Sequence, residues 1–190
     1  LFPAGQGFSY TDTGYILAGI IIEKAAGTTY YDQLQKRILA PLSLGLTSPS
    51  NDINLPGLVP GYLSPENPLG LPVKTVSDGL LVINPAIEWT GGGLVSNPED
   101  LVQWAKRLYE GNALEASYIE ELLESTWKGR PGTSHYGLGV SINESNLGAV
   151  YGHDGWFPGY RSKVAYFPSF KMAIAIQVNT DVNVDLGHYI

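Results

Sequence analysis

The first feature of this sequence that could take part in chemistry is a histidine framed by glycines. His153 lies in the stretch 151–160, in which four of the ten residues are glycine or proline, between runs that alternate like β-strands. Glycines occur at such density where the backbone must approach another group closely. We therefore interpret this stretch as the edge of a functional site.

A tyrosine near the start of the chain occupies a second position from which a side chain can face a cleft. Tyr10 precedes a predicted helix of about residues 13–26, which Gly27 ends. A second predicted helix begins at Thr28 and stops before Pro41. The first helix is indicated by three candidate N-cap residues, Thr11, Asp12 and Thr13. Apolar residues then recur at helical spacing, at Ile16, Leu17, Ile20 and Ile21.

The middle of the chain is predicted to be a long connection followed by a helix. Prolines break every candidate helix between residues 43 and 88, and a connection of this length usually has a function in a compact domain, so we expect it to wrap around the cleft. Three glycines, 91–93, then precede a helix with Asn97 as N-cap and Pro98 as first residue, which ends at Gly111. Its expected buried face consists of Leu101, Val102, Ala105, Leu108 and Tyr109.

The last third of the chain has the period of β-strands. After a short predicted helix at about 115–123, four strands are predicted, at residues 136–142, 148–152, 161–167 and 171–178. Because the strands are sequential and closely spaced, we expect an antiparallel meander, and helices followed by a sheet indicate an α+β fold. The helical and loop-rich region, 1–133, and the sheet region, 134–190, are expected to form one incomplete domain.

The composition argues against several classes of protein. The net charge of -7, from 11 basic and 18 acidic residues without a basic cluster, argues against a nucleic-acid partner. The absence of cysteine excludes thiol catalysis and disulfides, and suits an exported bacterial protein. No apolar run reaches the roughly 20 residues that span a bilayer. The chain begins with leucine and shows no signal peptide, so we expect a fragment of a longer protein.

Three segments carry a family resemblance. Residues 8–15 match a Tyr-x-Asn loop and its following helix, and residues 90–96 with Asp100 and Leu101 match a glycine-rich segment before a helix. Residues 136–139, 152–155 and 158–160 match a strand that carries Lys-Thr-Gly or its His-x-Gly variant. In order and spacing these segments resemble the serine β-lactamase and penicillin-binding protein superfamily, in particular its branch of class C β-lactamases, D-alanyl-D-alanine carboxypeptidases, D-aminopeptidases and related esterases.

The resemblance implies acyl transfer through a Ser-x-x-Lys motif, in which the lysine helps to activate the serine. That motif belongs upstream of Tyr10, so we expect it to lie outside these residues. Ser125 and Lys128 have the right spacing, but they follow the glycine-rich segment, and we interpret them as a polar helix end. We therefore expect the chain to be inactive alone and to associate with the missing N-terminal segment or with a second copy.

The same resemblance gives four residues expected roles. Tyr10 is the expected proton shuttle, and its phenol, with an ordinary pKa of ~10, needs nearby positive charge to ionise at neutral pH. His153 is expected to line the cleft and to bind Tyr10 or the substrate. The backbone N–H of Trp156 is expected to form half of an oxyanion hole. Gly155 is expected to let the substrate lie against the strand.

Two acidic residues depart from the family pattern. Asp12 stands where Asn is commoner, and it either pairs with the missing lysine or caps the following helix. Asp154 stands where a neutral threonine often meets the substrate carboxylate, so we expect it to repel such a carboxylate and to slow β-lactam turnover. A small ester or a peptide-like substrate is therefore favoured over a β-lactam.

Simpler interpretations of the same residues remain open. Outside these motifs His153 would be a turn residue and Tyr10 a packing residue, and residues 91–93 form either a flexible turn or a backbone wall of the cleft. His135, His153 and His188 lack the short spacing of zinc sites, so we expect no metal and no cofactor. The alternative to a hydrolase is a non-catalytic relative that binds peptidoglycan-type peptides or serves assembly. The resemblance favours a periplasmic or extracellular location.

Overall fold

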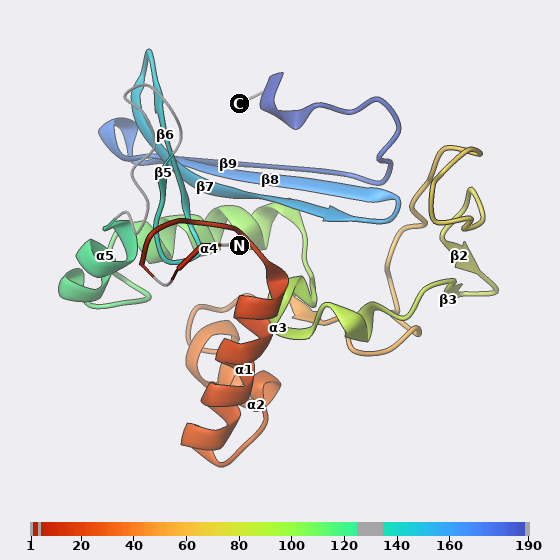
Figure 1. Cartoon of the computed structure of the whole chain (residues 1–190), viewed down its shortest axis with the longest axis horizontal. Helices are drawn as coiled ribbons and strands as arrows, with labels where there is room; N and C mark the ends of the chain where they lie inside the picture. The colour runs from red at the N-terminus through yellow and green to blue at the C-terminus, as the bar shows by residue number, and fades with distance from the viewer. Residues whose placement is uncertain (1, 4, 125–134, 189–190) are drawn as a thin grey trace.

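An antiparallel sheet with helices on one side dominates this structure (Figure 1), a computed structural model that describes residues 2–3, 5–124 and 135–188. Its strands lie in the order β5-β6-β7-β8-β9, so each pairs with its neighbours in sequence. The predicted meander and α+β class are confirmed. Ser125 and Lys128 lie outside the described residues. The strands are β5 (His135–Tyr136), β6 (Ser141–Ser145), β7 (Gly148–Phe157), β8 (Tyr160–Phe167) and β9 (Met172–Val178).

The predicted strand at 136–142 is wrong, because the chain turns back within it. The N–H of Gly137 donates to the carbonyl of Val140 (2.9 Å), and Gly139 has φ of 76°, in the left-handed region that glycine adopts without strain. A hairpin therefore joins β5 to β6. This hairpin sets Tyr136 on a separate strand at the border of the sheet, beyond β6.

Strand β7 runs farther than predicted and includes most of the glycine-framed stretch. It continues from Gly152 to Phe157, and the turn falls at Pro158 and Gly159. Strand β6 pairs with β7 only as far as the pair Ser141 and Gly152. From His153 onward, β7 is therefore paired with β8 on one side, and within the described residues no strand pairs with its other side.

Helix α1 (Asp12–Ala26) confirms the first predicted helix, with one correction at its start. The N-cap is Thr11, whose Oγ1 accepts from the N–H of Thr13 (3.3 Å), so the interpretation of Asp12 as the cap is wrong. Gly27 ends the helix with φ of 69°. Three apolar side chains of α1 remain largely exposed: Leu17 (56%), Ile20 (51%) and Ile21 (67%).

The second predicted helix is present in two parts, α2 (Tyr30–Leu34) and the π-helix η1 (Gln35–Leu39). Leu39 is buried there together with Leu42 and Leu44. Trp104 packs against this cluster from the helix α4 (Pro98–Tyr109). The cluster therefore joins α2 and η1 to the helix that supports the sheet.

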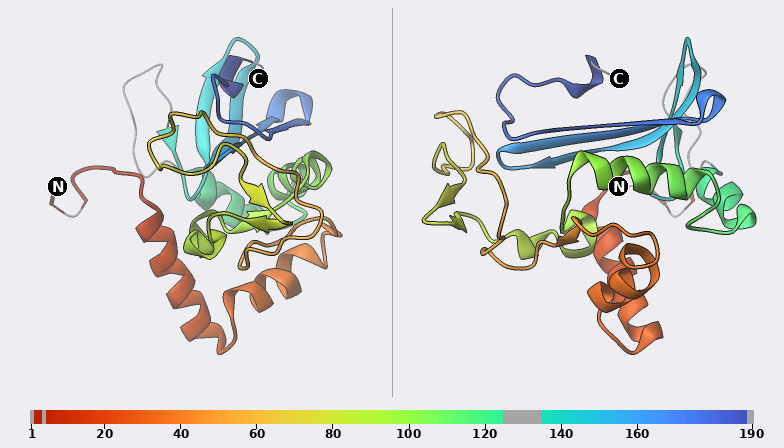
Figure 2. Two further views of the ribbon diagram at one scale, coloured as in Figure 1. Left: turned by 90° about the vertical axis from the view of Figure 1, so that its right-hand side faces the viewer. Right: turned by 180° about the vertical axis from the view of Figure 1, so that it is seen from behind.

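Helix α4 lies between the sheet and the pair α1 and α2, as Figure 1 and the view from behind in Figure 2 both show. It begins where predicted, since Asn97 Oδ1 accepts from the N–H of Asp100 (2.8 Å). Ala105 and Leu108 are buried as expected. Asp100 is also buried, which the apolar pattern did not predict, and its Oδ2 accepts from the N–H of Leu46 (2.9 Å) and from Thr47 Oγ1 (2.8 Å). The predicted short helix is α5 (Ala116–Leu123).

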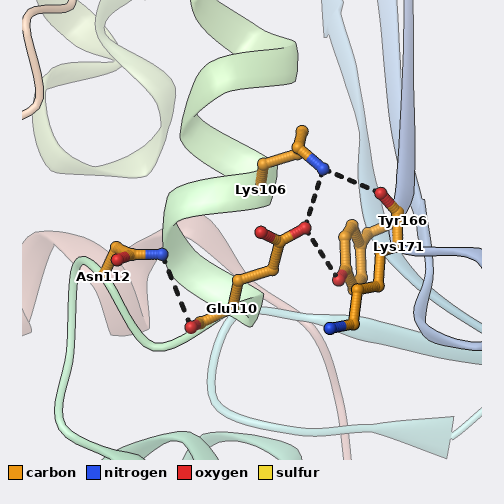
Figure 3. A network of polar contacts seen from close by, with 5 residues as sticks. All are labelled: Lys106, Glu110, Asn112, Tyr166 and Lys171. Carbon is orange, nitrogen blue, oxygen red and sulfur yellow. Dashed lines mark hydrogen bonds and ion pairs between the residues drawn. The ribbon is translucent and has the colours of Figure 1, made fainter.

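A polar network fixes the end of α4 against the sheet (Figure 3). Lys106 Nζ donates to Glu110 Oε1 (2.7 Å) and to the carbonyl of Lys171 (2.7 Å), and Tyr166 Oη donates to Glu110 Oε1 (3.3 Å). Glu110 follows the last helical residue and thereby connects α4 with β8. The hydrogen bond from Lys106 is the largest cause that lowers the pKa of Glu110.

The long connection contains short elements and is held against the turn between β7 and β8. Thr75 is fully buried, and its Oγ1 accepts from the N–H of Gly61 (2.9 Å). Tyr160 Oη donates to the carbonyl of Val59 (2.8 Å). A Cβ on Gly159 would lie 2.7 Å from Thr75 Cγ2 and 3.0 Å from the backbone of Gly61. The elements are β1 (Ser48–Pro49), paired with β4 (Leu94–Val95), β2 (Val76–Ser77), paired with β3 (Leu80–Leu81), and η2 (Pro85–Ile87).

Replacing Gly159 by alanine tests this close approach. Gly159 has φ of 82°, so Gly159→Ala adds backbone strain to the clash with Thr75, and we expect the free energy of unfolding in urea to fall by about 2–4 kcal/mol. Gly57 has φ of 85° but no atom within 4 Å of a Cβ built on it, so Gly57→Ala is the matched control and costs about 1 kcal/mol. Equal losses in the two variants would contradict a tight contact at Gly159.

The α4 network gives a pH dependence with a defined sign. Because the pKa of Glu110 is lowered in the folded state, its ionised form stabilises the fold above the ordinary glutamate range, and this contribution is lost as the pH falls through the lowered pKa. We expect Glu110→Gln to lower the thermal midpoint slightly at neutral pH, with the difference from wild type shrinking in acid. The exposed Glu120→Gln is the control. A pH-independent difference would contradict the role of the carboxylate.

Candidate active site

A cavity of about 750 Å³ brings together residues from distant parts of the sequence. The six residues expected to form the site all line it: Tyr10, Asp12, His153, Asp154, Gly155 and Trp156. The long connection contributes Ser50, Leu55, Leu58, Val59 and Leu81. The expectation that this connection wraps around the cleft is therefore confirmed.

Tyr10 stands at one side of this cavity, on the loop before α1, as predicted. Its Oη donates to Asp12 Oδ1 (3.3 Å), and its ring centroid lies 5.9 Å from that of His153. Burial is the largest cause that raises the pKa of Tyr10 to about 12, and the charge of Asp12 is the next. The described surroundings therefore oppose the ionisation of Tyr10, and a phenolate here requires a cation from elsewhere.

His153 faces Tyr10 from β7, and both of its ring nitrogens have partners. Nδ1 lies 2.6 Å from the carbonyl oxygen of Asp154, and Nε2 lies 2.8 Å from Tyr136 Oη. The sequence suggested a bond to Tyr10 or to the substrate. In the structure the hydrogen-bonding partner is Tyr136, because the β5–β6 hairpin sets this tyrosine beside Ser141, the first residue of β6, which pairs with Gly152 next to His153.

Tyr136 belongs to a pair of tyrosines that the sequence did not identify as part of the site. Its Oη lies 2.9 Å from Tyr15 Oη, and its ring packs edge-on against Tyr10 with centroids 5.7 Å apart. Burial is the largest cause that raises the pKa of Tyr136, followed by the hydrogen bond with Tyr15. The Tyr-Gly-Leu-Gly segment was a usable signal, since its glycines form the turn that places Tyr136.

Asp154 is paired within the sheet, which changes its expected effect. Its Oδ1 lies 3.0 Å from Nζ of Lys163, the residue opposite it on β8. Successive side chains of a strand point to opposite faces of the sheet, so the side chains of His153 and Asp154 lie on opposite faces. The ion pair offsets the charge of Asp154, and the repulsion of a substrate carboxylate is therefore weaker than the sequence alone suggests.

The glycines of the cleft permit close packing between elements. A Cβ on Gly155 would collide with Ser162 Oγ on β8, and a Cβ on Gly91 would lie 3.2 Å from Asp12 Cβ. Gly91 and Gly92 lie in the short helix α3 (Trp89–Gly92), so the interpretation of residues 91–93 as a flexible turn is wrong. Thr90 Oγ1 on α3 donates to the carbonyl of Tyr15 (2.7 Å) and fixes α3 against α1.

Glu88 is a third acidic residue that lines the cavity, beside Asp12 and Asp154, and the sequence did not indicate it. It lines the cavity directly before α3, and burial, followed by the charge of Asp12, raises its pKa. Together with Asp12 it makes the Tyr10 side of the cavity negative. Within the described residues, no group of three or more histidine, aspartate or glutamate side chains is arranged to hold a metal ion. No helix of the described ranges has the length and apolar character needed to cross a membrane.

The fold and the site define a protein of the β-lactamase and penicillin-binding type. The family model described as Beta-lactamase matches residues 1–189, so the chain belongs to the β-lactamase family, a family of hydrolases. Among curated relatives, penicillin-binding protein 4* of Bacillus subtilis (strain 168) is 24% identical over 192 residues, which cover 97% of this chain and 42% of the relative.

Two solved structures are also similar to this chain. A D-stereospecific amidohydrolase from Streptomyces sp. has a TM-score of 0.82 and 28% identity, with 95% of this chain and 52% of that chain covered. A D-amino acid amidase from Ochrobactrum anthropi SV3, complexed with L-phenylalanine, has a TM-score of 0.76 and 28% identity, with 92% of this chain and 52% of that chain covered. The chain thus spans about half the length of these relatives.

The raised pKa of Tyr10 can be tested by changing its acidic neighbours. Asp12→Asn removes a nearby charge, so we expect the pKa of Tyr10 to fall below about 12 but to stay above 10.0, because burial is the larger cause. At a pH of about 10 the ionised fraction of Tyr10, followed by NMR of its ring carbons, should rise. Glu88→Gln should give a smaller rise, since Glu88 is the smallest of the causes. An unchanged fraction in Asp12→Asn would contradict this account.

Proposed function

We propose that this chain forms one wall of the acyl-transfer site of a serine hydrolase that cleaves amide bonds of D-amino acid substrates. The attacking serine and its lysine are supplied by a Ser-x-x-Lys motif outside the 190 residues. The observation that carries the proposal is the shared cavity, where Tyr10 stands across from the part of β7 that, within the described residues, pairs with β8 alone. The similarity to a D-stereospecific amidohydrolase and a D-amino acid amidase supports the choice of substrate.

Tyr10 carries the proton in this proposal. The serine oxygen attacks the carbonyl carbon of the substrate while the serine proton passes to the ionised oxygen of Tyr10. The carbon–nitrogen bond then breaks, and Tyr10 returns the proton to the leaving nitrogen. Water next attacks the acyl-enzyme and gives its proton to Tyr10, which passes it to the serine oxygen as the acid is released. Since the pKa of Tyr10 is raised to about 12, the proposal requires the lysine of the motif to stabilise the phenolate. In the same proposal Asp12, which accepts from Tyr10 Oη, pairs with that lysine.

The backbone of β7 provides the anion site in this proposal. In an antiparallel strand, residues two apart direct their N–H and C=O groups to the same side. The carbonyl of Asp154 meets the ring of His153, which in turn bonds Tyr136 on the β5 side of β7. The N–H of Trp156 therefore points to that same side, toward the cavity, where it can donate to the oxyanion together with the N–H of the serine. Gly155 keeps this part of the strand close to β8.

The test uses the longest form of the protein that contains the Ser-x-x-Lys motif. We expect a fluorophosphonate to label its serine, and D-phenylalanine amide to be hydrolysed faster than L-phenylalanine amide or a penicillin. Tyr10→Phe should lower kcat at least about 100-fold, because proton transfer is lost, whereas Tyr118→Phe, an exposed tyrosine of α5, should leave kcat unchanged.

Three outcomes would overturn the proposal. Absence of fluorophosphonate labelling would favour a non-catalytic relative that binds peptides or serves assembly. Faster turnover of the penicillin than of the D-amide would show that the proposed substrate class is wrong. Hydrolysis by the 190-residue chain alone that is abolished by Ser125→Ala would show that the nucleophile has been placed wrongly.

A further inference from the structure

The contacts of His153 point to a function for two tyrosines beyond the proposed catalytic residues. We propose that Tyr136, supported by Tyr15, is a positioning residue that holds the imidazole of His153 with its hydrogen on Nδ1 and its ring fixed against Tyr10. This inference rests on the proposed function only for its effect on the reaction rate. The arrangement of the imidazole stands on geometry alone.

The hydrogens of this chain of contacts can be assigned from chemistry. A carbonyl oxygen only accepts hydrogen bonds, so the 2.6 Å contact with the carbonyl of Asp154 requires a hydrogen on Nδ1 of His153. In a neutral imidazole Nε2 is then an acceptor, and Tyr136 Oη must donate to it across 2.8 Å. With its single hydrogen used in this way, Tyr136 Oη accepts from Tyr15 Oη at 2.9 Å.

The same series of hydrogen bonds also accommodates a charged imidazole. When Nε2 carries a hydrogen, it donates to Tyr136 Oη, and Tyr136 Oη donates in turn to Tyr15 Oη, which needs only rotation of the hydroxyl hydrogens. A phenylalanine at position 136 offers neither an acceptor nor a donor. The hydroxyl of Tyr136 is therefore the group that keeps Nε2 paired in either charge state.

Tyr136 and the carbonyl of Asp154 together constrain the ring of His153. Tyr10 meets the ring through a tilted contact with centroids 5.9 Å apart, and Tyr136 has its own ring edge-on to that of Tyr10. The titratable groups that contact His153 include Tyr10 from the loop and Tyr136 from β5. Asp12 and Tyr15 of α1 bond Tyr10 and Tyr136 in turn, and the neighbouring Asp154 is ion-paired with Lys163 of β8. The bond to Tyr136 thus fixes the Nε2 end, and the Asp154 carbonyl fixes the Nδ1 end.

Nitrogen NMR of the imidazole tests the arrangement directly. In the ¹⁵N-labelled chain, we expect His153 to show a protonated Nδ1 and a hydrogen-bonded, unprotonated Nε2 at a pH where the ring is neutral. In Tyr136→Phe the Nε2 signal should move toward that of an imidazole nitrogen without a hydrogen bond. Tyr15→Phe should move it less in the same direction, and this variant decides the matter if Tyr136→Phe does not fold. Tyr118→Phe, exposed on α5, should move nothing.

The effect on the reaction is measured in the longer protein that carries the serine. We expect Tyr136→Phe to lower kcat about tenfold with KM unchanged, as is usual when an orienting partner of an active-site group is lost. A hydrogen on Nε2 in the neutral wild-type ring, an Nε2 signal unmoved in both variants, or an unchanged kcat would overturn the inference. A longer protein without hydrolase activity would instead overturn the proposed function, and the NMR result would still decide whether Tyr136 holds His153.

Discussion

The cleft depends on the point at which strand β6 begins, at Ser141. Pairing between β6 and β7 ends at Gly152, although β7 itself continues to Phe157. An antiparallel strand that loses one neighbour presents alternate N–H and C=O groups on that side. His153 is the first residue of this exposed part of β7, and the cavity lies against it. The backbone edge and the histidine thus reach the cleft for the same topological reason.

The opposite walls are held by contacts that leave no room for larger side chains. The long connection reaches the β7–β8 turn through Thr75, Gly61 and Gly159, where backbone lies against backbone. The loop that carries Tyr10 is held by α1, which α3 contacts through Thr90. An added methyl group would clash at such contacts, because tightly packed backbone atoms cannot move aside to make room for it. These contacts give the cleft, which strands β7 and β8 and the long connection line together, a defined geometry.

The polar groups of the cleft are unequally supplied with partners. His153 is paired at both nitrogens, and Asp154 is paired with Lys163. On the Tyr10 side, Asp12 and Glu88 place two carboxylates near a phenol whose pKa is raised to about 12. An arrangement of this kind favours a cation. In the function we propose, the lysine of a Ser-x-x-Lys motif is this cation, and it also eases the ionisation of Tyr10.

The local elements and the residue types of the cleft follow from the order of the amino acids alone. Caps and apolar period gave α1 and α4, the alternation of period two gave a sheet, and the motifs gave Tyr10 and His153, which now line one cavity. Three contacts could be found only in the folded chain: Tyr136 bonds His153, Lys163 pairs with Asp154, and Asp100 is buried with two donors. These contacts depend on strand register, hairpin position and helix docking, which arise between segments distant in sequence and leave no local periodic signal.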